Sequence, residues 1–243
     1  VAMVEGTKAE DISRIFNKIP LSCRLNVKEV TLDFSSSMEN AVVLSFPNAR
    51  LTTDRFHVQQ LVSDALQEMR VRLRWKAIEE ENGAVKQARQ SGTGFIPEVY
   101  TNGDTKKQLL ARSRYLLFKS SSKWTDRQKQ RAVILFEQFP ELEKAYDLTM
   151  CFRGVYETSK AREEAQRRFQ NWFQKIHASS FDSFKTAAHY LEDHLDTILN
   201  YFPDRSTNAS AESFNAKLKG FRALLRGVTD KKFFLFRVAK LYG

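Results

Sequence analysis

Two acidic side chains follow short apolar segments near the start of the chain. The segment TLD ends at Asp33, and the segment LTTD ends at Asp54. Both segments predict neighbouring parallel strands, which bring the two carboxylates to the carboxyl edge of one sheet, where α/β proteins build their sites. Clustered carboxylates suit the hard cations Mg²⁺ and Mn²⁺ better than His or Cys side chains do. The alternative is that each aspartate only caps the helix after it.

A third acid, Glu212, opens a predicted amphipathic helix. On a helical projection, one band beside it is basic and polar, and the adjoining side is apolar. The band contains Asn215, Lys219, Arg222 and Arg226, and the apolar side contains Phe214, Leu218, Phe221 and Leu225. Between Phe214 and the end of the chain there are eight Lys or Arg residues and one acid, Asp230. This density favours contact with phosphates, and an ordinary solvated face is the alternative.

Short strands and helices alternate at the start of the chain. Strands are predicted at residues 1–4, 27–33 and 49–53, with helices between them. Such alternation is typical of an α/β fold with mostly parallel pairing. The segment at 1–4 reads as the end of an edge strand, so we expect further strands before it.

The pattern changes after Asp54. A long helical segment covers residues 56–80, and a polar stretch with several glycines at 81–104 predicts a mobile loop. Helical periodicity continues from residue 105 onward, and its aromatic residues have the spacing of core positions. His189 and His194 lie five apart there, which does not align them as metal ligands, so we interpret them as surface histidines.

Composition narrows the class of partner. The chain has 39 Lys and Arg residues against 29 Asp and Glu residues, a formal charge of +10 that points to a polyanionic partner. Its two cysteines, Cys23 and Cys151, are far apart, as in a reducing compartment. No uncharged run is long enough to span a bilayer, which predicts a soluble, cytoplasmic protein without a membrane partner. P-loop, dinucleotide-binding and nucleophile-elbow motifs are absent, which removes support for nucleotide hydrolysis and acyl transfer.

Two long segments resemble a known family. LDFSSSMENAVVLSFPNARLTTDRFHV and RSTNASAESFNAKLKGFRALLRGVTDKKFF are similar to the catalytic half of bacterial insertion-sequence transposases of the ISL-three group. These enzymes belong to the DDE superfamily, which has a ribonuclease H-like core. The resemblance depends on two motifs in this order, Asp-Arg-Phe-His-Val and then Asn-Ala-x-x-Glu-x-x-Asn-x-Lys-x-Lys. It extends over nearly the whole chain.

The resemblance implies a fold class of α/β plus α. A partial ribonuclease H-like core of three strands with intervening helices would be interrupted by a large helical insertion and completed by a C-terminal catalytic helix. The expected parts are a partial core at residues 1–80, a mobile loop at 81–104, an insertion domain at 105–201 and C-terminal core helices at 202–243. With residues 1–4 as the third strand of the core, the first catalytic acid would precede residue 1.

The resemblance also assigns roles to side chains. Asp33 matches the second catalytic acid and Glu212 the third, and both would be metal ligands for two Mg²⁺ or Mn²⁺ ions. Such paired ions activate a water or a 3′-hydroxyl and stabilise the leaving oxygen during displacement at a phosphodiester. Asp54 and His57 are secondary candidates, because a strand-terminal Asp and a nearby His can support a site without taking part in its chemistry. The predicted DNA contacts are Arg55, Asn215, Lys217, Lys219, Arg222 and Arg226.

The expected function is therefore cleavage and strand transfer at insertion-element ends. The partners would be the element ends, target DNA and, in the full-length protein, further copies of the chain; the location would be a bacterial cytoplasm, on the nucleoid when bound to DNA. The fragment without its first acid is expected to be inactive alone. Two alternatives remain open: a non-catalytic helical module that binds DNA or oligomerises, and a metal-dependent nuclease of the same fold.

Overall fold

The computed structural model describes residues 6–226 and 228–242. The chain divides into two compact units, each described by itself below. The first unit consists of Val1–His57 and His194–Gly243, and the second of Val58–Asp193. The chain therefore leaves the first unit after His57 and returns to it at His194.

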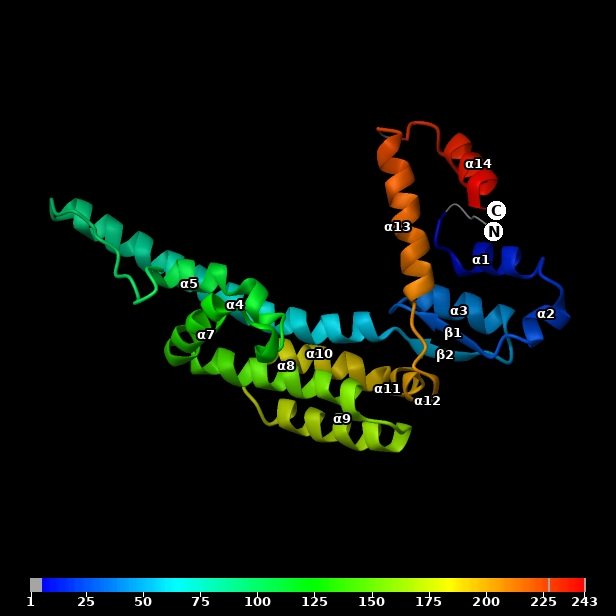
Figure 1. Cartoon of the computed structure of the whole chain (residues 1–243), viewed down its shortest axis with the longest axis horizontal. Helices are drawn as coiled ribbons and strands as arrows, with labels where there is room; N and C mark the ends of the chain where they lie inside the picture. Colours follow the sequence, from blue (N-terminus) through cyan, green and yellow to red (C-terminus); the bar gives the residue numbers. More distant parts are fainter. Residues whose placement is uncertain (1–5, 227, 243) are drawn as a thin grey trace. The chain divides into compact units, whose positions relative to one another are not determined.

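A small parallel sheet lies in the first unit. Strand β1 (Glu29–Leu32) pairs with β2 (Arg50–Thr53), from Glu29 opposite Arg50 to Leu32 opposite Thr53. Helix α3 (Ser36–Ser45) connects the two strands, and Figure 1 shows it lying along them. A parallel pair needs such a crossover, because its second strand must start again at the same end as the first. The consequence is that both strands end at the same edge of the sheet.

Helix α3 also contacts the helix that precedes the sheet. Helices α1 (Ala9–Phe16) and α2 (Leu21–Leu25) come before β1, and α1 packs on α3. The Phe16 and Phe46 rings lie 5.1 Å apart, and Ala41 and Val42 of α3 are buried. The sheet and its neighbouring helices thus have a small apolar core of their own.

The returning segment attaches to β2. Helices α11 (Leu195–Leu199) and α12 (Tyr201–Asp204) follow His194. The side chain of Asn200 donates a hydrogen bond to the Leu51 carbonyl (2.7 Å), and the hydroxyls of Thr197 and Thr53 are 2.7 Å apart. These contacts fix where the chain continues into its last two helices.

The last two helices pack against each other through aromatic rings. They are α13 (Ala209–Leu224) and α14 (Lys231–Tyr242). Phe221 stacks on Phe234 with ring centroids 5.7 Å apart, and Phe214 meets Tyr242 edge-on at 5.6 Å. The predicted apolar side of α13 is the half-buried side, and no residue of this helix is fully buried. Most of the surface of α13 therefore faces solvent.

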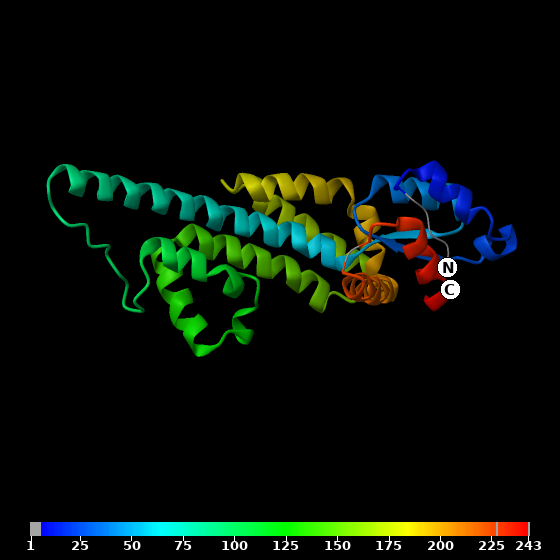
Figure 2. The same ribbon diagram turned by 90° about the horizontal axis from the view of Figure 1, so that it is seen from above.

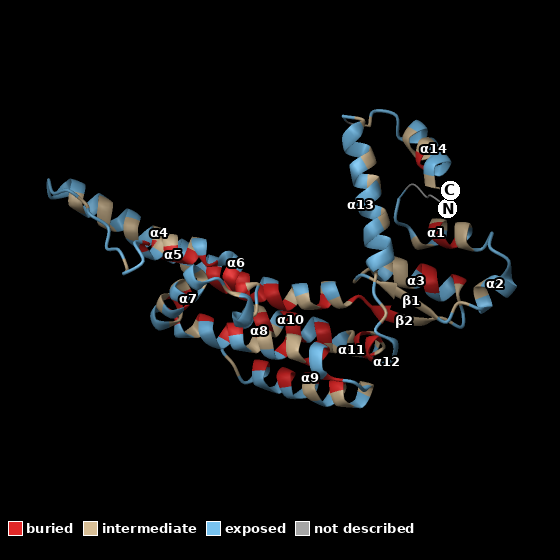
Figure 3. Ribbon diagram, viewed as in Figure 1, coloured by how far each residue is buried: buried red, intermediate tan, exposed pale blue. Residues whose placement is uncertain are grey.

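The second unit is helical. Its elements are α4 (Arg55–Gln90, which begins in the first unit), α5 (Lys106–Arg112), α6 (Arg114–Leu117), the 3-10 turn η1 (Ser121–Lys123), α7 (Asp126–Gln138), α8 (Pro140–Thr158), α9 (Arg162–His177) and α10 (Asp182–Asp193). Figure 3 shows buried residues on the facing sides of α8, α9 and α10. Phe152 and Trp172 lie at the centre of this core, 4.8 Å apart, and both are buried. Phe152, Phe169, Trp172, Phe173 and Phe184 are core residues, as their spacing predicted, whereas Tyr115 and Tyr190 are exposed.

Helix α4 differs from its predicted extent. It continues to Gln90, ten residues into the stretch that we predicted as a mobile loop. The residues from Glu80 to Gln90 are mostly good helix formers, and the single Gly83 costs only about 1 kcal/mol, which does not stop a helix. The loop expectation is therefore wrong for residues 81–90, whereas residues 93–98 lack regular structure.

Helix α4 also explains why the second unit starts earlier than the predicted insertion. It lies beside α8 and α10 (Figure 2), and Ser183 donates a hydrogen bond to the Ala65 carbonyl (3.0 Å). Arg153 donates one to the Ser63 hydroxyl (3.3 Å). Because α4 buries its apolar side against these helices, residues 58–80 belong with them and not with the sheet. The assignment of a catalytic core and an insertion domain remains a prediction.

The fold class agrees with the sequence in its coarse features. The described residues are mostly helical and form one sheet of two parallel strands, near the predicted positions 27–33 and 49–53. The strand predicted at residues 1–4 lies outside the described residues. A three-stranded ribonuclease H-like core therefore remains a prediction. No described helix has the length and apolar character needed to cross a membrane.

Candidate active site

Asp33 and Asp54 stand side by side at the carboxyl edge of the sheet. Each follows the last residue of its strand, and the two last residues, Leu32 and Thr53, are paired in the register. The Asp54 backbone N–H continues the ladder by donating to the Leu32 carbonyl (2.8 Å). Both aspartates therefore follow adjacent parallel strands, as predicted from the sequence.

Asp54 is a buried carboxylate, and both of its oxygens accept hydrogen bonds. Only 4% of its side chain is exposed. Its Oδ2 accepts a hydrogen bond from the Phe56 backbone N–H (3.2 Å) and lies 3.2 Å from His57 Nδ1. Its Oδ1 accepts a hydrogen bond from the Asn208 backbone N–H (3.4 Å). Asp54 thus holds the first turn of α4, as the capping alternative proposed, and it also holds the chain before α13.

Asp33 has a different environment. Its side chain is 57% exposed. Oδ1 accepts a hydrogen bond from Asn208 Nδ2 (3.1 Å) and lies 3.5 Å from His57 Nδ1. No residue in the described ranges donates to Oδ2. Asp33 does not cap the next helix, because Ser35 occupies the cap position and its hydroxyl accepts from the Met38 N–H (3.4 Å). One oxygen of Asp33 is therefore open to solvent.

His57 joins the two carboxylates. Its Nδ1 lies within 3.5 Å of an oxygen of each aspartate, and a third of its side chain is exposed. A proton on Nδ1 can be shared between them, which relieves the repulsion of two adjacent negative charges. The role of His57, a secondary candidate in the sequence, remains a prediction.

Asn208 is the residue that the sequence argument missed. It immediately precedes α13 and contacts both aspartates, Asp33 through its side chain and Asp54 through its backbone. The signal was present, because Asn208 is the first residue of the Asn-Ala-x-x-Glu motif. Its contacts join residues 175 positions apart, which no local pattern reveals.

Glu212 lies one helical turn after Asn208. Its backbone N–H donates to the Asn208 carbonyl (2.8 Å), and its side chain is exposed in the first turn of α13. No hydrogen bond or ion pair within the described ranges joins the Glu212 carboxylate to Asp33. The structure therefore brings together Asp33, Asp54 and His57, and it puts Glu212 about 6 Å along the helix axis from the residue that contacts both aspartates.

The comparison with protein families identifies the family of the chain. The model of the DDE transposases of the ISL-three group, described simply as "Transposase", matches residues 1–238. The chain belongs to this transposase family. No curated protein and no solved structure matched the chain. Membership in this family implies a role in cleaving and transferring DNA.

The predicted DNA contacts of this transposase are mostly accessible. Asn215, Lys217, Lys219 and Arg222 are exposed on α13, and Arg226 is exposed just beyond its end. Arg226 has a positive φ of 52°, the left-handed conformation that ends many helices. Arg55 differs from the others, because it is half-buried and its Nη1 lies 3.4 Å from the Tyr201 hydroxyl. Arg55 therefore contacts α12 and is less accessible to DNA than the other predicted contacts.

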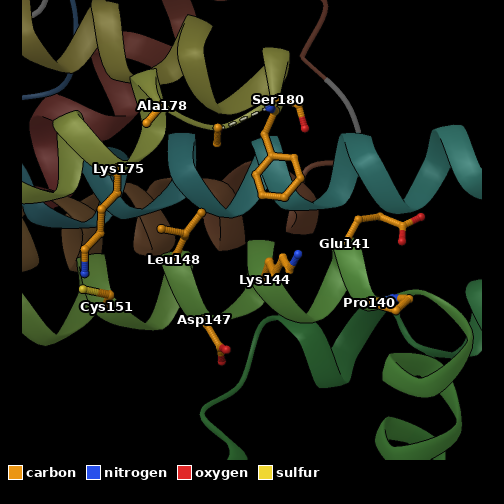
Figure 4. A pocket seen from close by; sticks show the side chains of 11 residues that line it. Pro140, Glu141, Lys144, Asp147, Leu148, Cys151, Lys175, Ala178 and Ser180 are labelled. Atoms are coloured by element: carbon orange, nitrogen blue, oxygen red, sulfur yellow. Dashed lines mark hydrogen bonds between the residues drawn. The ribbon is translucent and has the colours of Figure 1, made fainter.

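A cavity in the helical unit of the transposase contains none of these residues. It measures about 930 Å³ and lies between α8 and the turn from α9 to α10 (Figure 4). Lys144, Lys175, Asp147 and Cys151 line it. These side chains mix both charges, and no arrangement of them corresponds to the predicted chemistry.

Proposed function

We propose that this transposase cleaves and rejoins phosphodiesters at insertion-element ends with the help of divalent cations held by Asp33 and Glu212. The observation that carries the proposal is the double contact of Asn208. Because its side chain meets Asp33 and its backbone meets Asp54, it ties the start of α13 to the carboxyl edge of the sheet. Glu212 then follows within the first turn of that helix.

The chemistry of the donor set supports a divalent cation at Asp33. A hard cation needs accessible carboxylate oxygens, and Asp33 has an exposed one while both oxygens of Asp54 accept hydrogen bonds within the protein. Asp33 and Glu212 would hold the ions, which are Mg²⁺ or Mn²⁺. Two such ions would activate the attacking water or 3′-hydroxyl and stabilise the leaving oxygen.

Asp54, His57 and Asn208 are positioning residues in this proposal. Asp54 holds the backbones before α4 and α13, and Asn208 Nδ2 holds one oxygen of Asp33 so that the other faces outward. His57 stands between the carboxylates and offsets their charge when it is protonated. These contacts restrict the Asp33 side chain, which favours a defined ligand geometry.

DNA would lie along the exposed side of α13. Lys219 and Arg222 lie on the same side of α13 as Glu212, and Arg226 follows just beyond the helix end, so that phosphates neutralised by these residues would pass beside the proposed metal ligand. Lys217 is exposed on another side of the helix. The N-terminus of α13 points toward the aspartates and carries partial positive charge, which lowers the cost of gathering acids there. The basic side chains of α13 would also reduce the repulsion among the carboxylates of Asp33, Asp54 and Glu212.

Substitution of Glu212 tests the proposal. In the transposase acting on DNA that carries the element ends, Glu212→Gln should lower cleavage and strand transfer by at least about 100-fold, because the amide is a poor ligand for Mg²⁺. DNA affinity should change less than about threefold. Asp64→Asn, at an exposed aspartate of α4, serves as the matched control and should retain full activity.

The alternatives predict different results. A non-catalytic binding module would show no cation-dependent cleavage in any variant. A nuclease would cut the DNA but would not join the cut ends to a target. Retention of strand transfer by Glu212→Gln would overturn the assignment of Glu212 as a metal ligand.

A further inference from the structure

Three potential metal ligands meet at the α9–α10 hairpin of the helical unit. His177 is the last residue of α9, and His189 and Glu192 lie on α10. One ligand atom of each residue lies within 4.8 Å of the others. His177 Nε2 is 3.0 Å and 3.1 Å from the two oxygens of Glu192, and His189 Nδ1 is 3.5 Å from Oε2. The two imidazole rings are 4.9 Å apart.

The backbone at this cluster is fixed by packing. Ile176, Ala188 and Leu191 each precede one member of the cluster in the sequence, and all three are buried. The turn between the helices is held by Ser179, whose hydroxyl donates to the Ile176 carbonyl (2.7 Å) and accepts from the Phe181 N–H (3.2 Å). His189 and Glu192 are three residues apart and therefore share a side of α10. The cluster is thus built on two rigid helices, with only its side chains free to adjust.

The residue types and spacing suit zinc. Two imidazoles and one carboxylate are a common zinc ligand set, and bonds of about 2.0–2.1 Å in a tetrahedron separate the ligand atoms by about 3.3 Å. The separations to Glu192 are already near this value, and small rotations of the imidazoles would bring the nitrogens closer together. Without a cation, two histidines share one carboxylate, which is a weak arrangement at an exposed position.

We propose that His177, His189 and Glu192 form a zinc site that crosslinks α9 to α10. The side chains are 37%, 70% and 35% exposed, so the fourth position of the tetrahedron is open to water. Imidazole ligands select a borderline ion such as Zn²⁺ over Mg²⁺, whereas the carboxylates at the sheet edge suit the harder ions. The two sites would therefore hold different cations at the same time.

The direct test is a calorimetric titration of the tag-free chain with Zn²⁺ in the presence of excess Mg²⁺. We expect one equivalent to bind. His177→Ala, His189→Ala and Glu192→Gln should each weaken binding by about tenfold or more, because each removes one of three ligands. Asp193→Asn changes the neighbouring exposed carboxylate of α10 and should have no effect.

A second measurement separates this site from the proposed active site. Zn²⁺ should raise the thermal unfolding temperature of the chain, and this shift should disappear in the double variant His177→Ala, His189→Ala. The zinc-induced shift should persist in Asp33→Asn, because this substitution alters only the proposed active site. The zinc proposal and the active-site proposal can therefore fail independently. Unchanged zinc affinity in the double variant, or an absence of binding to the wild-type chain at submillimolar Zn²⁺, would overturn the proposal.

Discussion

At the scale of single residues, the two strand-terminal aspartates have separate tasks. Asp54 is buried and satisfies two backbone N–H groups, whereas Asp33 is exposed and keeps one oxygen open. The sequence ranked Asp33 above Asp54 from the resemblance alone, and the geometry supplies the physical reason for that order. A carboxylate that already holds the fold together is poorly placed to hold an ion as well.

This difference predicts different effects on stability. Asp54→Ala should lower the free energy of unfolding by about 1–3 kcal/mol, because it removes a buried acceptor and leaves the part-buried N–H groups of Phe56 and Asn208 without their hydrogen bonds. Asp33→Ala should change it by less than about 1 kcal/mol, because the lost contacts are exposed and charge repulsion with Asp54 is relieved. Urea denaturation measures both. Equal losses in the two variants would contradict the division of tasks.

At the scale of elements, the sequence predicted those parts of the fold that depend on local signals. The two strands that precede Asp33 and Asp54 form near the predicted positions 27–33 and 49–53. Thr125 and Pro140, residue types that favour helix starts, cap α7 and begin α8. Local signals failed where tertiary contacts decide. Thr7 and Glu10 have the spacing of a capping box, but α1 begins at Ala9, and the Thr7 carbonyl instead accepts a hydrogen bond from Ser37. The pairing of His177 with His189 also escaped prediction, because it joins two helices.

Asp104, a buried carboxylate of the helical unit, connects α5 and α7 through ion pairs and gives a pH-dependent prediction. Asp104 is fully buried before α5 and is paired with Arg112 of α5 and Arg131 of α7. Burial by itself raises the pKa of Asp104, but hydrogen bonds from Arg131 and Arg112 outweigh it and hold the pKa below its ordinary value. The carboxylate therefore stabilises the folded state above the unfolded pKa of about 3.9, and this contribution is lost as the pH falls through the folded pKa.

Asp104→Asn should accordingly lower the free energy of unfolding by about 1–3 kcal/mol at pH 7. The difference from wild type should shrink below about pH 4, because the unfolded wild-type chain then binds a proton at Asp104 that the folded state takes up only at lower pH. Urea unfolding followed by the helical circular dichroism signal at several pH values measures this. Asp126→Asn, at a carboxylate that is 92% exposed, is the control. A difference that stays constant between pH 7 and pH 3 would refute the assignment.

At the scale of the whole molecule, part of the formal charge of +10 can be assigned to the C-terminal helices. Eight basic residues follow Phe214, and those on α13 are exposed beside Glu212. Composition alone predicted a polyanionic partner, and membership in a transposase family identifies that partner as DNA. Which basic residues touch phosphate could not be predicted from composition, because charge density on a helix does not distinguish a binding face from a solvated one.

The salt dependence of DNA binding distinguishes these two cases. Lys219→Ala and Arg222→Ala should each weaken binding to all sequences and reduce the slope of log affinity against log salt by about 0.9, because each removes one phosphate contact. Lys18→Ala, at an exposed lysine of the same unit, should leave the slope unchanged. Binding measured by fluorescence anisotropy over a range of salt concentrations gives the slopes. Wild-type slopes in the α13 variants would show that this face is merely solvated.

Asp33 and Glu212, far apart in the sequence, are proposed to share divalent cations. Anomalous diffraction from crystals of the transposase grown with Mn²⁺ locates the ions directly. We expect manganese within about 2–2.6 Å of carboxylate oxygens of both Asp33 and Glu212, with Asp54 outside the ligand shell. Manganese bound by neither residue, or by Asp54 in place of Asp33, would contradict this proposal.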